Sequence, residues 1–189
     1  MYKILDVNKD DYVLDATCGS GGFLVKAMAN MIREAGGMQS DTAAEIKSSH
    51  LYGIEFDREI YALACANMLI HKDGKTNLEQ MDARTESACE WMKSKPITKV
   101  LMNPPYENKY GCMTIVENVL DNVPAHTQCA FILPDKKLEK ASKAQIKRIL
   151  KNHRLRKVIK LPEDLFFGIG ITTSIFVFEA GVGQDGKEF

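Results

Sequence analysis

The chain has 189 residues, 45% of them hydrophobic and 26% charged, and its 25 basic and 25 acidic side chains give a formal net charge of zero. This length and composition are typical of one globular domain. The longest apolar runs are far shorter than a bilayer-spanning helix, and the first residues lack the apolar run of a signal peptide, so we expect a cytoplasmic protein with no membrane partner. Five cysteines without a Cys-x-x-Cys pair argue against a disulfide framework and against a metal site.

Short aliphatic or β-branched runs alternate with longer segments of helical period, which predicts an α/β fold with a mainly parallel sheet. The predicted helices cover residues 23–34, 58–71, 113–121 and 138–152, and residues 35–50 are interpreted as an excursion between a helix and a strand. The segment between the last two strands is too short for a helical crossover, so the final strand is expected to be antiparallel to its predecessor. The predicted strands are Tyr12–Leu14, Leu51–Ile54, Val100–Met102, Ala130–Leu133, Lys157–Leu161 and Ile171–Phe178.

A glycine-rich turn follows the first predicted strand, in residues 12–24. Glycines there allow positive φ and let the backbone approach a ligand closely, although a purely structural turn would look the same. Asp15 and Glu55 end two predicted strands, and carboxylates so placed bind ribose hydroxyls. Leu24 occupies the third glycine position of a dinucleotide fingerprint, and no Gly-Lys-Ser/Thr of a phosphate loop follows. The pattern therefore favours a nucleoside ligand without a pyrophosphate.

An Asn-Pro-Pro-Tyr segment, residues 103–106, follows the third predicted strand. Two prolines fix φ and remove two backbone donors, which leaves free carbonyls on a stiff chain. The Asn103 side-chain oxygen and the Pro104 carbonyl could both accept hydrogen bonds from one exocyclic NH₂ group, and Tyr106 offers a flat face for stacking. A strand stop with an aromatic ring packed on proline is the structural alternative.

Together these motifs resemble the N6-adenine DNA methyltransferases, most closely the modification subunits of type I restriction systems. Residues 15–24 resemble their cofactor loop, residues 53–55 their ribose-binding strand end and residues 103–106 their catalytic motif, with weaker matches in order at 67–71, 131–135, 161–166 and 170–175. The resemblance implies S-adenosylmethionine as cofactor. It also implies a Rossmann-like class I methyltransferase fold, with a mostly parallel seven-stranded sheet and an antiparallel last strand.

The resemblance further implies double-stranded DNA with a flipped adenine as substrate, and specificity and restriction subunits of a restriction-modification complex as partners. Asn103 and Pro104 would localise the lone pair of the adenine amino nitrogen by accepting its two hydrogens. Tyr106, and more weakly Phe166, would stack on the base, although the adjacent Phe166 and Phe167 could equally be core residues. The catalytic residues are expected to be Asn103, Pro104, Pro105 and Tyr106; the cofactor-binding residues are expected to be Asp15, Ala16, Thr17, Cys18, Gly19, Gly21, Gly22, Phe23, Glu55, Phe56, Asp82, Ala83 and Asn103.

We expect one methyltransferase catalytic domain over residues 1–189. In the resembled family a helical domain precedes the cofactor loop, and type I systems recognise their DNA sequence through a separate subunit; we expect a core fragment without either. Two alternatives stay open. Protein glutamine N5-methyltransferases also resemble the segment at 103–106, because a side-chain amide presents the same NH₂ group, and an inactive S-adenosylmethionine-binding or assembly module would share the cofactor loop. A nicotinamide-dependent dehydrogenase fits least well.

The zero net charge hides a basic segment, residues 136–160, with eleven Lys or Arg residues against one acid, Glu139. The remainder of the chain has 14 basic and 24 acidic residues. We interpret the basic segment as a strip that contacts phosphates or docks a partner, with a solvated helix face as the alternative. Neutrality therefore does not exclude DNA as a partner.

Overall fold

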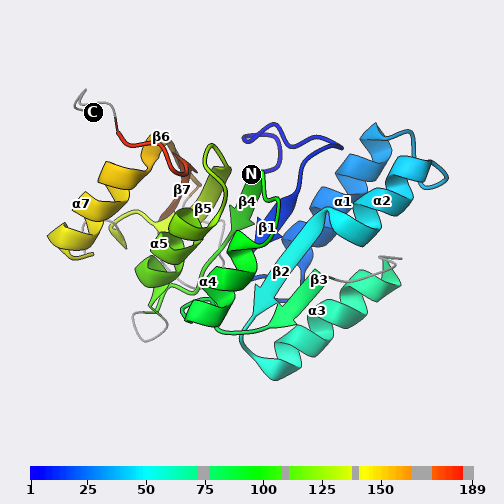
Figure 1. Cartoon of the computed structure of the whole chain (residues 1–189), viewed down its shortest axis with the longest axis horizontal. Coiled ribbons are helices and arrows are strands. Elements are labelled where there is room, and N and C mark those ends of the chain that lie inside the picture. The colour runs from blue at the N-terminus through cyan, green and yellow to red at the C-terminus, as the bar shows by residue number, and fades with distance from the viewer. Residues whose placement is uncertain (72–76, 108–110, 138–140, 163–171, 185–189) are drawn as a thin grey trace.

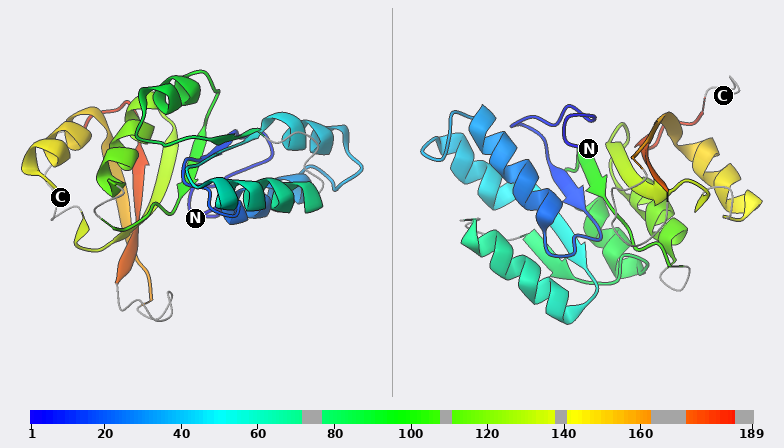
Figure 2. Two further views of the ribbon diagram at one scale, coloured as in Figure 1. Left: turned by 90° about the horizontal axis from the view of Figure 1, so that it is seen from below. Right: turned by 180° about the vertical axis from the view of Figure 1, so that it is seen from behind.

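A central seven-stranded sheet with helices on both faces forms the described part of the computed structural model, which comprises residues 1–71, 77–107, 111–137, 141–162 and 172–184 (Figures 1 and 2). The strand order is β3-β2-β1-β4-β5-β7-β6. The inner strands are buried on both faces, as expected of parallel strands covered by helices. The strands are β1 Val13–Asp15, β2 Leu51–Glu55, β3 Asn77–Gln80, β4 Lys99–Met102, β5 Gln128–Pro134, β6 Arg154–Lys160 and β7 Thr173–Glu179.

The sheet confirms the predicted topology. Strands β1 to β5 are parallel to one another, whereas β7 is inserted between β5 and β6 and is antiparallel to both. β2 and β3 lie on one side of β1, and β4 and the later strands lie on the other side. The strand order therefore reverses direction at β1. Ligands of such sheets bind at the carboxyl ends of the strands beside this switch point, where the segments after β1, β2 and β4 meet.

Helices on each face enclose a separate hydrophobic cluster. Helices α4, α5 and α7 pack on one face, around Phe131 and Phe178. Helices α1, α2 and α3, with the N-terminal segment around Leu5, pack on the other. The helices are α1 Gly22–Glu34, α2 Asp41–Ser49, α3 Arg58–Ile70, α4 Glu86–Lys93, α5 Cys112–Asn122 and α7 Lys143–Asn152.

Strand β3 and helices α2 and α4 are not predicted from the sequence, and helix α7 begins later than predicted. β3 is an edge strand with one buried residue, Leu78, so its sequence lacks an apolar run. α2 lies inside the excursion predicted at 35–50, and the Ser40 side chain caps it by accepting from the Ala43 N–H. α4 is short and is capped in the same way by Thr85. α7 begins at Lys143 rather than at 138, because Ser142 caps its N-terminus; residues 138–140 lie outside the described residues.

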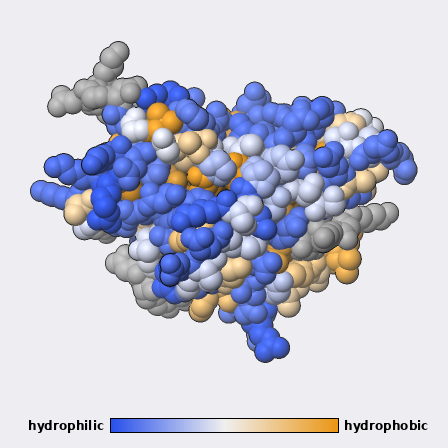
Figure 3. Space-filling model, in the orientation of Figure 1, coloured by the Kyte–Doolittle hydropathy of each residue, from blue (hydrophilic) through white to orange (hydrophobic). Residues whose placement is uncertain are grey.

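The outer side of α3 is apolar. Leu63, Leu69 and Ile70 are among the most exposed large hydrophobic side chains, and the surface over this helix is orange and tan at the lower right of Figure 3. α3 has 13 residues, which is too short to cross a bilayer. None of the helices in the described ranges combines the length and the apolar content that a membrane crossing requires.

Candidate active site

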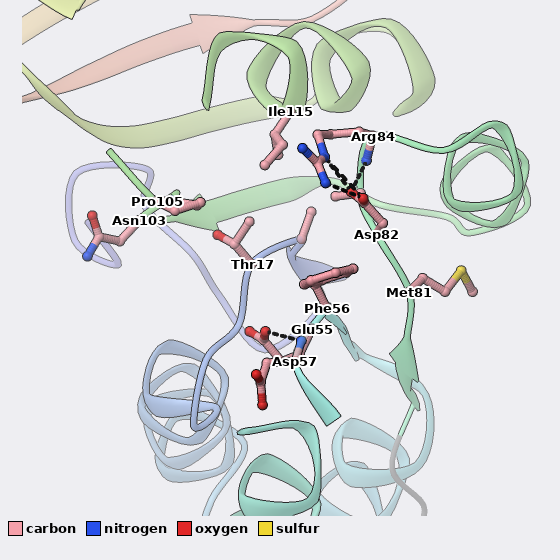
Figure 4. A pocket seen from close by; sticks show the side chains of 12 residues that line it. Thr17, Glu55, Phe56, Asp57, Met81, Asp82, Arg84, Asn103, Pro105 and Ile115 are labelled. Carbon is pink, nitrogen blue, oxygen red and sulfur yellow. Dashed lines mark hydrogen bonds and ion pairs between the residues drawn. The ribbon is translucent and has the colours of Figure 1, made fainter. Parts of the chain in front are cut away.

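A cavity of about 360 Å³ opens at the carboxyl edge of the sheet, where the segments after β1, β2, β3 and β4 meet the first turn of α5 (Figure 4). Its volume is within the range of small-molecule binding sites. Apolar and charged side chains contribute to its wall. The lining residues are Ala16, Thr17, Glu55, Phe56, Asp57, Met81, Asp82, Ala83, Arg84, Asn103, Pro105 and Ile115.

The glycine loop after β1 folds back onto the end of β2. Gly19 and Gly21 have φ values of 55° and 81°, in the left-handed region that favours glycine. The Gly19 N–H donates to the Glu55 Oε2 at 2.9 Å, and the Cys18 N–H donates to the Ile54 carbonyl at 2.9 Å. Burial raises the pKa of the Cys18 thiol, so this side chain packs the loop rather than offering a thiolate.

β2 ends in a carboxylate that faces the cavity with acceptor capacity remaining. Glu55 Oε1 accepts from the Asp57 N–H at 2.9 Å, as Oε2 does from Gly19, so each oxygen has one backbone donor. A carboxylate oxygen can accept more than one hydrogen bond, so both are able to receive ribose hydroxyls as well. Asp57 caps α3 through the N–H groups of Glu59 and Ile60, which fixes the chain that presents Glu55.

Two features of the cavity wall call for a ligand. The Phe56 ring lines the cavity and is 60% exposed, so it offers a flat apolar face to solvent. The Thr17 hydroxyl is buried and has no hydrogen-bond partner among the described residues, although it too lines the cavity. Buried polar atoms are normally paired, so a ligand with polar and aromatic parts fits both observations.

Asp15 ends β1 beneath the loop and is 1% exposed. Its Oδ1 accepts from the Thr17 N–H at 3.1 Å. Burial raises the pKa of Asp15 to about 7; the Thr17 hydrogen bond opposes the rise and the nearby Glu55 charge adds to it. Asp15 therefore acts on the loop from below and does not line the cavity.

The turn after β3 places Asp82 at the cavity with its carboxylate already bound. Arg84 donates from Nε to Asp82 Oδ1 at 2.8 Å and from Nη2 to Oδ2 (Figure 4). These hydrogen bonds lower the pKa of Asp82. The Ala83 carbonyl accepts from the Asn118 side chain of α5 at 3.1 Å, which ties the turn to the opposite wall. Asp82 is thus oriented rather than being a loose surface carboxylate.

The loop after β4 presents Asn103 with its acceptor oxygen engaged by Tyr106. The Tyr106 hydroxyl donates to Asn103 Oδ1 at 2.7 Å. Burial raises the pKa of Tyr106 to about 12, so the hydroxyl keeps the proton that it donates. In Figure 4 the Asn103 amide points away from Phe56 and from the centre of the cavity. The amide therefore faces a region beside the cavity rather than inside it.

The structure brings about half of the predicted residues to one cavity. Ala16, Thr17, Glu55, Phe56, Asp82, Ala83, Asn103 and Pro105 line the cavity, whereas Asp15, Cys18, Gly19, Gly21, Gly22, Phe23, Pro104 and Tyr106 lie outside its wall. Phe166 and Phe167 lie outside the described residues. Sequence reasoning missed Asp57, Met81, Arg84 and Ile115. Asp57, Met81 and Arg84 are sequence neighbours of predicted site residues, and this nearness could have indicated them. Ile115 belongs to a helical apolar pattern, and nothing in the sequence indicates that it lines a site.

A sequence profile described as N-6 DNA methylase matches residues 1–133 and 114–187 of the chain. The chain belongs to the N-6 DNA methylase family. This confirms the predicted resemblance, and it favours DNA adenine methylation over the glutamine and nicotinamide alternatives. Membership of this family, together with the fold, implies S-adenosylmethionine as the methyl donor.

Known proteins resemble the chain over nearly its whole length. The type II restriction enzyme and methyltransferase RM.BcgI of Heyndrickxia coagulans is 34% identical in an alignment 192 residues long; the alignment covers 96% of this chain and 30% of that protein. The crystal structure of the type I restriction enzyme EcoKI M protein matches with a TM-score of 0.81 at 17% identity, over 95% of this chain and 41% of the other. A Listeria monocytogenes protein assigned to the class I S-adenosylmethionine-dependent methyltransferases matches with a TM-score of 0.75 at 19% identity, over 98% and 59%.

The two structural matches confirm the class I methyltransferase fold. The chain spans less than two thirds of the length of each of these three proteins.

Proposed function

We propose that this chain transfers a methyl group from S-adenosylmethionine to the N6 amino group of adenine in double-stranded DNA. The observation that carries the proposal is the meeting of three segments around one cavity: the glycine loop, the carboxylate end of β2 and the loop of residues 103–106. The family of the chain supports the same reaction.

The lining residues offer groups that match those of the cofactor, which supports the proposal. S-adenosylmethionine, when bound, supplies a methyl group on a positively charged sulfur. Glu55 would accept from the ribose hydroxyls, and Phe56 would lie against the adenine ring. Asp82, fixed by Arg84, would accept a hydrogen bond from the adenine amino group of the cofactor. The Thr17 hydroxyl, which has no partner in the described residues, would form a hydrogen bond with the cofactor. The loop from Gly19 to Phe23 would approach the cofactor with its backbone.

Asn103 and Pro104 would hold the target base beside the cavity. Their oxygens would accept the two amino hydrogens, which localises the nitrogen lone pair and aims it at the cavity. Flipping the adenine out of the duplex costs a few kcal/mol, and stacking on Tyr106 would return roughly 1 to 3 kcal/mol. The hydrogen bond from the Tyr106 hydroxyl to Asn103 Oδ1 would break when the amino group of the base takes its place. Phe166 remains a predicted second stacking residue.

The relatives carry the names of restriction enzymes and of a type I M protein. We infer that this chain works within a bacterial restriction-modification complex, as a single catalytic domain beside specificity and restriction subunits. A cytoplasmic location follows from that role and stays a prediction.

Methyl transfer can be tested with radiolabelled S-adenosylmethionine and unmethylated genomic DNA, followed by digestion to nucleosides. The proposal expects the label in N6-methyladenine. Label in a methylated cytosine would contradict it, and label on a glutamine-containing peptide in a parallel reaction would support the glutamine alternative. Calorimetric titration of the cofactor is the companion measurement: binding without transfer to any DNA would support an inactive binding module, and absence of binding would remove every methyltransferase interpretation.

Some cations of the basic segment form ion pairs, although their side chains are also exposed. Arg148 pairs with Glu117, Arg156 with Glu179 and Lys160 with Asp135. Three lysines four residues apart on α7 are exposed and form one face of the helix: Lys143, Lys147 and Lys151. The surface over α7 is correspondingly blue at the left of Figure 3. We propose this lysine face as the phosphate-contacting part of the segment.

Replacing Lys143, Lys147 and Lys151 with Gln is expected to reduce the salt dependence of DNA binding. Each phosphate contact contributes about 0.9 to the slope of log K against log salt, so the triple variant should lose about 2 to 3. Fluorescence anisotropy on a mixed-sequence duplex at several salt concentrations measures the slope. Gln at Lys3, Lys26 and Lys93, exposed lysines outside the basic segment, is the charge-matched control; equal slopes for both variants would refute the assignment.

A further inference from the structure

We propose that Lys137 is a positioning residue for the catalytic loop of residues 103–106: its ammonium group anchors the main chain at Tyr106. The inference rests on the proposed function and adds to it a side chain from a different strand end. Lys137 follows β5, whose parallel neighbour β4 leads into the loop, so both segments leave the same edge of the sheet.

One short contact carries the inference. Lys137 Nζ donates to the main-chain carbonyl of Tyr106 at 2.6 Å, across 31 residues of sequence. A hydrogen bond from a charged donor is roughly twice as strong as one between neutral groups. Lys137 is half-buried, whereas its neighbour Lys136 is exposed. Lys137 is therefore turned inward, unlike the solvent-facing lysines of α7.

The sequence of the loop removes two main-chain donors that could otherwise help to fix it. Pro104 and Pro105 have no N–H group, so the main chain at these positions can accept hydrogen bonds but cannot donate them. The Tyr106 side chain holds Asn103 Oδ1 in the structure, and the target amino group would have to displace that hydroxyl. The Lys137 contact is to the main chain of Tyr106, so it persists while the side chain changes partner.

This geometry separates a positioning lysine from a DNA-contacting one. A lysine bound to a phosphate contributes to DNA affinity and to its salt dependence. A lysine that fixes the loop contributes to the alignment of Asn103 with the amino group, and a misplacement of about 1 Å is sufficient for a loss of about 100-fold in rate. Loss of Lys137 should therefore lower kcat and leave KM for DNA and the salt slope in place.

The test compares Lys137→Met, Lys137→Arg and the control Lys136→Met in two measurements. The first is kcat and KM for N6-methyladenine formation on unmethylated duplex DNA. The second is hydrogen exchange, by mass spectrometry, of the peptide that contains Asn103, Tyr106 and Glu107. We expect Lys137→Met to lower kcat by about tenfold or more, to keep KM within about twofold, and to accelerate exchange in this peptide. Lys137→Arg should restore most of the kcat and most of the protection of this peptide from exchange, and Lys136→Met should match the wild type in both measurements.

Two results would overturn the inference. Lys137→Met could match Lys136→Met in both measurements, or it could raise KM and flatten the salt slope while kcat stays unchanged, which would make Lys137 a phosphate contact. If the wild type forms no N6-methyladenine, the proposed function fails, and the exchange measurement then decides the anchor alone. In that case, unchanged hydrogen exchange in Lys137→Met would refute the anchoring role of Lys137. Faster exchange in Lys137→Met, with exchange close to the wild type in Lys137→Arg, would support it.

Discussion

Replacement of Asn103 with Ala is expected to lower the rate of adenine methylation by about 100-fold or more while cofactor binding stays within a few-fold of the wild type. The reason is geometric. The Asn103 amide points away from the cavity that we assign to the cofactor and is the acceptor proposed for the amino group of the target base. Nucleoside analysis of methylated DNA gives the rate, and calorimetry gives the cofactor affinity.

The structural alternative for Asn103 can be separated from the chemical one. Asn103→Ala also removes the hydrogen bond with Tyr106, so a loss of activity could come from a disordered loop. Tyr106→Phe breaks the same hydrogen bond but keeps Asn103 and the stacking ring, and should retain most of the methylation. Equal losses in both variants would favour the structural role. Methylation that survives in Asn103→Ala would refute the proposed role of this side chain.

The strands around the site were predictable because buried strands leave short runs of apolar residues in the sequence. β1, β4 and β5 pass through the core and contain short continuous apolar runs, so composition marks them. β3 borders the sheet and buries Leu78 alone, and a pattern of this kind does not differ from a loop. α2 and α4 are short helices set by the caps Ser40 and Thr85 rather than by a long apolar stripe.

The site was predictable where neighbouring residues carry the chemistry. A carboxylate at a strand end led to Glu55, which lines the cavity, and also to Asp15, which does not. The clamp of Arg84 on Asp82 and the contact of Lys137 with Tyr106 were not predictable, because long side chains choose their partners in three dimensions. Charge counting placed Lys137 among eleven similar residues and could not tell which of them faces inward.

Asp15→Asn is expected to remove a pH-dependent loss of stability. The pKa of Asp15 rises from its ordinary value of 3.8 to about 7 in the folded chain, mainly through burial. The folded state then holds a proton that the unfolded state releases, so the stabilising contribution is complete below about pH 4 and disappears as the pH rises through 7. About three pKa units at about 1.4 kcal/mol each correspond to a loss on the order of 4 kcal/mol between pH 4 and pH 8.

Thermal unfolding of both proteins without cofactor, from pH 5 to pH 8, measures this contribution. The Tm of the wild type should fall relative to that of Asp15→Asn over this range, by an amount on the order of 10 °C. The slope is the diagnostic quantity, because a buried Asn amide carries its own desolvation cost at every pH. Glu55→Gln is the second comparison: Glu55 adds to the rise of the Asp15 pKa, so its neutralisation should make the fall in Tm smaller and end it at a lower pH. Parallel curves for wild type and Asp15→Asn would show that Asp15 is ionised throughout, and that the glycine loop is built around a carboxylate rather than a protonated acid.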